Sequence, residues 1–142
     1  MKLYSNTLIL TLCAICLFLV SCNTNTKTET EYIKLLETTK SWNGATLPKY
    51  PEGQPKITIL KAVIPPHTQL DVHKHNVINA AVMLDGELTV VTEAKDTLHV
   101  KAGDAFEEVV NTWHHGINNS AKPASLIIFY AGTKGGTNTI LK

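Results

Sequence analysis

The chain has 142 residues, of which 44% are hydrophobic and 18% are charged, and its formal net charge at pH 7 is +1. This length suits one domain and leaves too few residues for two domains of ordinary size. The near-zero charge and the lack of a basic patch argue against binding to nucleic acid.

The beginning of the chain is typical of an export signal. Lys2 is followed by an apolar run over 8–20, which is shorter than the ~20 residues that a membrane-spanning helix needs. The sequence Leu-Val-Ser-Cys that ends at Cys22 resembles the lipobox of bacterial lipoproteins, whose cysteine carries lipid. This resemblance implies a signal peptide over 1–21, lipidation of Cys22 and attachment to a membrane at the bacterial cell envelope. An ordinary secretory signal with an incidental cysteine is the alternative.

The cysteine content limits the chemistry of the mature protein. Cys13 and Cys16 lie in the segment that would be removed, and Cys22 would carry lipid. No thiol then remains for a disulfide, a nucleophile or a metal. Any metal site must use nitrogen and oxygen ligands, and the domain needs a hydrophobic core because it has no crosslink.

The segment 22–40 is predicted to be a lipidated tether. Its first part is polar and has no apolar periodicity, whereas 31–39 contains four apolar residues that could form one or two helical turns. Turn-forming residues then dominate 41–55, which predicts an N-terminal arm laid across a sheet, with one short strand near 45–47. We assign 41–142 to the folded domain.

The rest of the chain is a series of short strand-like runs separated by turn signals, and no helix of normal length is needed after Thr39. This pattern predicts an all-β sandwich or barrel. Asp85-Gly86 predicts a hairpin turn, and 132–142 is a Gly/Thr-rich end. The expected strands cover 56–64, 70–75, 78–84, 87–92, 97–101, 105–110 and 124–131.

Two histidines within one expected strand are candidate metal ligands. His73 and His75 are separated by one residue, so on an extended strand they point to the same side and offer two imidazoles to one ion. His114 is a third candidate from another apolar, strand-rich segment. His115 and His99 are expected to face solvent, because each lies opposite a neighbour that is expected to point inward.

The same histidines give the chain a resemblance to the cupin superfamily. The first cupin motif, G-x5-H-x-H-x3,4-E-x6-G, matches at His73, His75 and Gly86, but His67 replaces the opening glycine and Asn79 replaces the glutamate. The second motif, G-x5-P-x-G-x2-H-x3-N, matches at its glycine, its histidine and its asparagine. These three residues are Gly103, His114 and Asn118.

The resemblance implies a small antiparallel jelly-roll β-barrel that binds one divalent metal ion, such as Fe, Mn, Zn or Ni, and that pairs as a homodimer. It carries the metal-ligand role to His73, His75 and His114. Asn79 stands where the family has a glutamate, and an amide oxygen can bind a metal but brings no charge. Three neutral imidazoles leave the charge of the ion uncompensated and favour an anionic ligand.

Other residues are candidates for the surroundings of this site. Glu108 shares a strand face with Phe106 and could replace the missing charge, although that face could also point outward. His67, Trp113 and Asn118 could line the pocket. The alternatives are a loop position for His67, packing for Trp113 and a structural hydrogen-bonding role for Asn118. Tyr130 is expected mainly to pack.

Two functions remain open from the sequence. One is a metal-dependent enzyme, most similar to a dioxygenase but also compatible with an isomerase or hydrolase, that acts on a small anionic oxygenated molecule. No catalytic residue is assigned for it. The other is a non-catalytic cupin at the cell envelope that binds or senses a small ligand or a metal. Fold alone does not decide between them.

Overall fold

The computed structural model describes residues 29–142, and every regular element in this range is a β-strand. Residues Lys34–Lys142 form one compact unit. The predicted signal peptide and Cys22 lie outside the described residues. Within residues 29–142, no helix has the length and apolar character needed to cross a membrane. The strands are β1 (Pro55–Ile64), β2 (Thr68–Gln69), β3 (His73–His75), β4 (Ile78–Asp85), β5 (Glu87–Thr92), β6 (Thr97–Lys101), β7 (Ala105–Glu107), β8 (His114–Asn118), β9 (Ala124–Thr133) and β10 (Thr139–Leu141).

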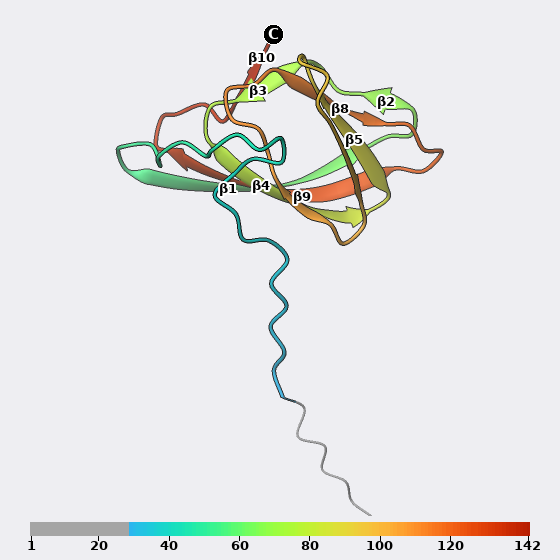
Figure 1. Ribbon diagram of the computed structural model, residues 1–142, viewed down its shortest axis with the longest axis horizontal. Helices are drawn as coiled ribbons and strands as arrows, with labels where there is room; N and C mark the ends of the chain where they lie inside the picture. Colours follow the sequence, from blue (N-terminus) through green and yellow to red (C-terminus); the bar gives the residue numbers. More distant parts are fainter. Residues whose placement is uncertain (1–28) are drawn as a thin grey trace, which may run out of the picture. The chain divides into compact units, whose positions relative to one another are not determined.

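The strands form two antiparallel sheets. One has the order β1-β9-β4-β7, and the other has the order β10-β3-β8-β5-β6, with β2 paired to β8. Figure 1 shows β1, β4 and β9 on one side of the domain and β3, β8 and β5 on the other. The predicted all-β, antiparallel fold is confirmed, and two facing sheets of this kind are typical of a jelly roll.

Side chains that alternate along the strands fill the space between the sheets. On β5, the alternating residues Leu88, Val90 and Thr92 are buried. On β4, Asn79, Ala81 and Met83 occupy the equivalent inward positions. The central hydrophobic cluster consists of Ile64, Ala81, Met83, Leu88, Val90, Val100, Phe106, Ala124 and Leu126.

The turn at Asp85-Gly86 differs from the hairpin that the sequence predicted. It joins β4 and β5, which belong to different sheets and do not pair. Gly86 has a φ of 73°, and a Cβ there would lie 2.8 Å from the carbonyl oxygen of Pro123. The glycine therefore serves a close backbone crossing between the sheets as well as a left-handed turn.

Three strand boundaries also differ from expectation. The predicted strand 70–75 is reduced to β3, with the separate β2 lying before it, and the predicted strand 105–110 ends at Glu107. The Gly/Thr-rich end contains β10, which pairs with β3 through Thr139 and His75. This pairing is a tertiary contact, which local sequence preference does not reveal.

The segment before β1 differs from the prediction in two places, one in the tether and one in the N-terminal arm. Residues 31–38 are exposed and form no helix, because so short a helix is unstable without a packing partner. The expected strand near 45–47 is reduced to one bridge between Lys40 and Thr46. Within this turn Ser41 is buried and bonds to the segment after β7, so the arm closes one part of the domain.

Candidate metal centre

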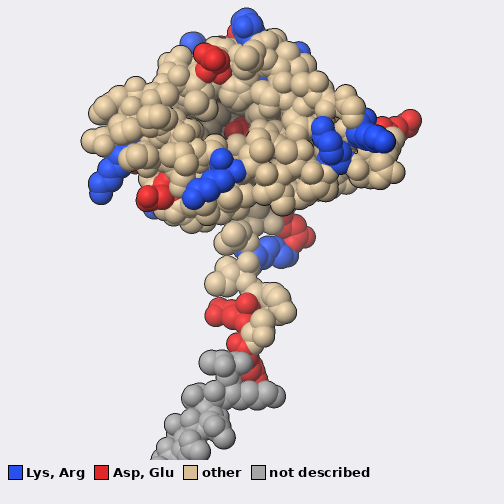
Figure 2. All heavy atoms as spheres, turned by 180° about the vertical axis from the view of Figure 1, so that it is seen from behind, with Lys and Arg blue, Asp and Glu red and all other residues tan. Residues whose placement is uncertain are grey.

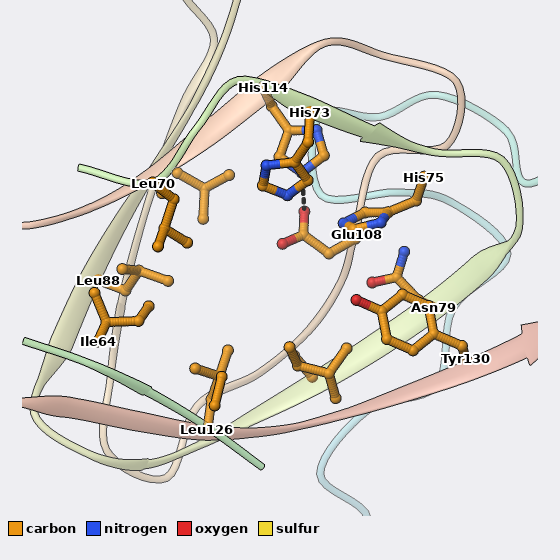
Figure 3. A pocket seen from close by; sticks show the side chains of 15 residues that line it. Ile64, Leu70, His73, His75, Asn79, Leu88, Glu108, His114, Leu126 and Tyr130 are labelled. Atoms are coloured by element: carbon orange, nitrogen blue, oxygen red, sulfur yellow. Dashed lines mark ion pairs between the residues drawn. The ribbon is translucent and has the colours of Figure 1, made fainter. Parts of the chain in front are cut away.

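The three candidate histidines meet because β3 and β8 are neighbours. His73 pairs directly with His114 in the antiparallel register, and His75 follows on the same face of β3. One ligand nitrogen from each ring lies within 4.8 Å of the others. Figure 3 shows the three rings gathered at one side of the pocket. The sequence prediction that these side chains converge agrees with this geometry.

Each ring is fixed through its Nδ1 atom. The Nδ1 of His73 donates to the carbonyl of Asp71 at 2.7 Å, and the Nδ1 of His114 donates to the carbonyl of Thr112 at 2.8 Å. The Nδ1 of His75 lies 3.1 Å from the hydroxyl of Thr139 on β10. The two bonds to carbonyls leave the Nε2 atoms of His73 and His114 as available lone pairs, which is the arrangement that metal-binding histidines commonly have.

Burial keeps the rings neutral. It lowers the pKa of His75 to about 3, with further lowering by the neighbouring His114 and His73. Burial is also the main reason that the pKa values of His73 and His114 are lowered. Neutral imidazole is the form that binds a metal, so the site is prepared for an ion at neutral pH.

The histidines border a cavity of about 70 Å³ between the two sheets. It is far smaller than the ~300–1,000 Å³ pockets that hold drug-sized ligands. Figure 2, which views the domain from the side opposite to Figure 1, shows a hollow with acidic atoms visible inside it. In Figure 3 the polar side chains lie toward one side of the cavity, and the aliphatic side chains of Ile64, Leu70, Leu88 and Leu126 line the opposite part.

The side chain of Asn79 lines this cavity from β4 without any hydrogen bond. Its exposed fraction is 0%, and neither its Nδ2 nor its Oδ1 has a partner. A buried amide without partners costs stability, because it gives up its hydrogen bonds to water. The side chain is therefore available to something that enters the cavity. The Nε2 of His114, whose exposed fraction is 1%, is also without a hydrogen-bond partner.

Glu108 brings a carboxyl group into the cavity. Its Oε2 lies 3.9 Å from the Nε2 of His114 and accepts a hydrogen bond of 3.4 Å from the indole of Trp42. Burial raises the pKa of Glu108 to about 7. Of the two orientations left open by the sequence, the structure has the inward one. The preceding Glu107 does not line the cavity, although burial raises its pKa to about 7 as well.

Tyr130 lies on the cavity wall beside His75. The two ring centroids are 5.4 Å apart, and burial raises the pKa of Tyr130. The sequence predicted mainly a packing role for this residue. Its position opposite Asn79 in the β4–β9 register explains why both side chains reach the same cavity.

Three predicted pocket residues do not line the cavity. His67 is exposed in a loop with a φ of 52°. Trp113 packs beneath the ammonium of Lys74, whose Nζ is 4.8 Å from the ring centroid. Asn118 is buried, and its amide donates to the carbonyls of Ile64, Pro65 and Lys122. Loop geometry, ring packing and backbone bonding account for these positions.

Other residues near the site follow or extend the sequence analysis. His115 points away from the cavity and His99 is exposed, as expected. The sequence predicted no role in this site for Trp42 or Thr139. Trp42 has no local signal beyond being a large apolar residue in a turn-rich arm, and Thr139 becomes relevant only through the pairing of β10 with β3.

Comparison with known families and structures agrees with the fold. The model of the cupin domain matches residues 60–130, which is half of the chain. No curated protein sequence matches the chain significantly. The match begins within β1 and ends within β9, so it includes all three histidines.

Several solved structures resemble the domain at low sequence identity. The DMSP lyase DddQ from Ruegeria pomeroyi DSS-3 has a TM-score of 0.53 at 16% identity, over 61% of this chain and 43% of that one. An oxalate oxidase in complex with the substrate analogue glycolate has a TM-score of 0.51 at 16% identity, over 60% and 45%. A point mutant of Bacillus subtilis oxalate decarboxylase OxdC has a TM-score of 0.52 at 17% identity, over 60% and 23%. The aligned part is less than half of each of these chains, and the likeness concerns the fold.

Proposed function

The chain belongs to the cupin superfamily, and from this premise we propose that it binds one divalent metal ion through His73, His75 and His114 and acts on a small anionic molecule in the adjoining cavity. The observation that carries the proposal is the convergence of three neutral imidazoles, two buried and one half-buried, whose Nδ1 atoms are already bonded. The unpartnered Nε2 of His114 fits this role, because a metal would satisfy it.

The charge of the site supports an anionic partner. Three imidazoles contribute no charge, so at least part of the charge of a divalent ion remains for another ligand to balance. The small cavity restricts that ligand to a few heavy atoms. Two of the structural neighbours are an oxalate oxidase and an oxalate decarboxylase, and oxalate and the analogue glycolate are small carboxylates of this kind.

The residues of the chain would divide the work in the cavity. When bound, the ion would polarise an oxygen-bearing ligand or, if it is redox-active, activate dioxygen. The amide of Asn79 can both donate to and accept from the ligand, and Tyr130 forms the wall beside it. The aliphatic side chains on the opposite part exclude water, which strengthens the polar contacts at the histidines.

Metal content tests the proposal directly. The wild-type protein and His75→Ala, both purified without chelator, should differ by about one equivalent of divalent metal in elemental analysis. His99→Ala is the matched control, because His99 is an exposed histidine outside the cavity. Equal metal content in the wild type and His75→Ala would refute the proposed site.

Turnover separates an enzyme from a binding protein. We expect the metallated wild-type protein to consume oxygen, or to convert a member of a panel of small carboxylates and dicarbonyl compounds, and we expect His75→Ala to be inactive. Lack of activity together with a small molecule that co-purifies only with the wild type would identify a binding or sensing protein instead.

We extend the proposal to the location of the protein. The Leu-Val-Ser-Cys sequence that ends at Cys22 supports lipid attachment at this cysteine and anchoring at the bacterial cell envelope. Mass spectrometry of the N-terminal peptide should find lipid in the wild type and none in Cys22→Ser. A Cys22→Ser protein that still carries lipid would contradict this part of the proposal.

The outer face of the β1 sheet supports a homodimer. β1 is an edge strand, and it exposes Ile57, Ile59, Leu60 and Val63, with an exposed fraction of 63% for Ile59. Exposed apolar groups of this kind on a sheet edge favour association with a second copy. Light scattering should find a dimer for the wild type and a monomer for Ile59→Lys. If both the wild type and Ile59→Lys are dimers, the outer face of β1 is not the dimer interface.

A further inference from the structure

We propose that Glu108 is the carboxylate of the metal site, supplying the negative charge that position 79 lacks, and that Trp42 of the N-terminal arm holds it in place. This inference rests on the proposed binding of a metal by the three histidines. It assigns the missing charge to Glu108, which lies in a different segment from Asn79, the position where the cupin motif has its glutamate.

The position of Glu108 meets the first requirement, which is proximity. Glu108 follows β7, and its carboxyl group enters the cavity from there. Its Oε2 is 3.9 Å from the Nε2 of His114, one of the three clustered histidines. Figure 3 shows the carboxyl group beside the rings of His114 and His73, on the side that faces the cavity.

The second requirement is that the carboxylate of Glu108 lacks a compensating positive charge, and its surroundings meet this requirement. A buried carboxylate is costly unless a cation or several hydrogen bonds compensate it. Within residues 29–142, Glu108 forms an ion pair with no lysine or arginine, and its carboxyl group receives one side-chain hydrogen bond, from Trp42. An uncharged histidine cluster gives it no counter-charge. A divalent ion bound by the rings and the carboxylate would give Glu108 its counter-charge and would give the rings a partner.

The arm meets the third requirement, which is a fixed orientation. The indole Nε1 of Trp42 donates to the Oε2 of Glu108 at 3.4 Å, and the backbone N–H of Trp42 donates to the carbonyl of Glu107 at 3.0 Å. The hydroxyl of Ser41 donates to the carbonyl of Glu108 at 2.8 Å. The arm thus holds the backbone as well as the carboxyl group, and Trp42 acts as a positioning residue.

Titration of the metal-free protein with Co²⁺ tests the proposal, because the absorption of the bound ion reports both affinity and ligand environment. Glu108→Gln keeps the shape but removes the charge, and we expect it to weaken Co²⁺ binding by about 10- to 100-fold. The double variant Asn79→Glu with Glu108→Gln should recover most of this loss, since it restores one carboxylate. Thermal unfolding of each metal-free variant checks that it folds.

The matched control is Glu107→Gln, which changes the neighbouring buried carboxyl group outside the cavity and should leave Co²⁺ affinity unchanged. Trp42→Phe should weaken binding several-fold in the wild type and have no further effect in Glu108→Gln. A merely structural role of Trp42 would lower affinity equally in both.

The outcomes separate this inference from the proposed function. If the wild type binds Co²⁺ through the histidines but Glu108→Gln binds equally well, the inference is wrong and the metal site stands. A loss in Glu108→Gln that a folded double variant does not recover also overturns it. If neither the wild type nor His75→Ala binds Co²⁺, the proposed function fails first.

Discussion

His73 on β3 lies directly opposite His114 on β8, and their ring centroids are 4.5 Å apart. This single cross-strand pair brings together two segments that are far apart in the sequence. It also makes the site sensitive to register, because a shift by one residue would turn His115 inward in place of His114. The site therefore depends on the pairing of β3 with β8.

Asn79 provides a test of whether the cavity is built for a ligand at the expense of stability. Asn79→Leu replaces an unpartnered buried amide with an apolar side chain of similar shape. We expect the free energy of unfolding of the metal-free protein to rise by about 1–3 kcal/mol, because the cost of the unbonded groups disappears. Urea unfolding measures this change.

A second buried polar residue supplies the control for this prediction. Thr92 is also fully buried, but its hydroxyl accepts from the backbone N–H of Asp96 at 3.1 Å. Thr92→Val should therefore lower the free energy of unfolding by about 1–3 kcal/mol, since it leaves that N–H without its partner. Destabilisation of Asn79→Leu to a similar degree would contradict the interpretation of Asn79.

Gly86 should be intolerant of a side chain. In Gly86→Ala the new Cβ would lie 2.8 Å from the carbonyl oxygen of Pro123 and 2.9 Å from the Cα of Ala124, both of them backbone atoms. We expect a loss of more than about 2 kcal/mol, measured by urea unfolding. Gly103→Ala has a similar positive φ but no neighbour within 4 Å, so it should lose only about 1–2 kcal/mol. Equal losses would mean that the close crossing at Gly86 is unimportant.

Asn118 should matter for stability and not for metal binding. Its amide donates to the carbonyls of Ile64, Pro65 and Lys122, which joins β8 to two other segments. Asn118→Ala should lower the free energy of unfolding by about 2–4 kcal/mol, because it removes three hydrogen bonds made by a fully buried side chain. Metal content per folded protein should remain that of the wild type. A selective loss of metal would instead place Asn118 in the site.

The raised pKa of Glu107 predicts that the stability of the folded state falls as the pH rises. Burial raises its pKa from 4.5 to about 7, so the folded state holds a proton that the unfolded state releases at lower pH. Its contribution is fully present below about pH 4.5 and is lost as the pH rises through about 7. The free energy of unfolding of the wild type, relative to Glu107→Gln, should therefore fall by about 1–3 kcal/mol across this window. A rise over the same window would refute the shift.

The sequence was informative where structure is local or periodic. Alternation along 87–92 predicted that Leu88, Val90 and Thr92 share one face of a strand, and in the structure they do, with that face buried. The spacing of His73 and His75 predicted one shared side of a strand, which the structure also has. These results follow from the two-residue period of a strand, which needs no knowledge of its partners.

Local sequence preference was uninformative where distant segments meet. Asp85-Gly86 has the composition of a hairpin turn, yet its two strands enter different sheets, because the pairing of β4 with β9 and of β5 with β8 decides their direction. The contact between Trp42 and Glu108 links residues 66 positions apart. Such contacts are set by packing of the whole domain, and no local preference encodes them.

The hydrogen bond between Thr139 and His75 has a consequence for the timing of metal uptake. It joins His75 on β3 to β10, a strand that lies 64 residues later in the sequence. The orientation of His75 is therefore complete only after β10 has paired with β3 during folding. Because an unfolded chain rarely offers such a preformed site, the ions present in the compartment where folding finishes decide which metal the protein acquires.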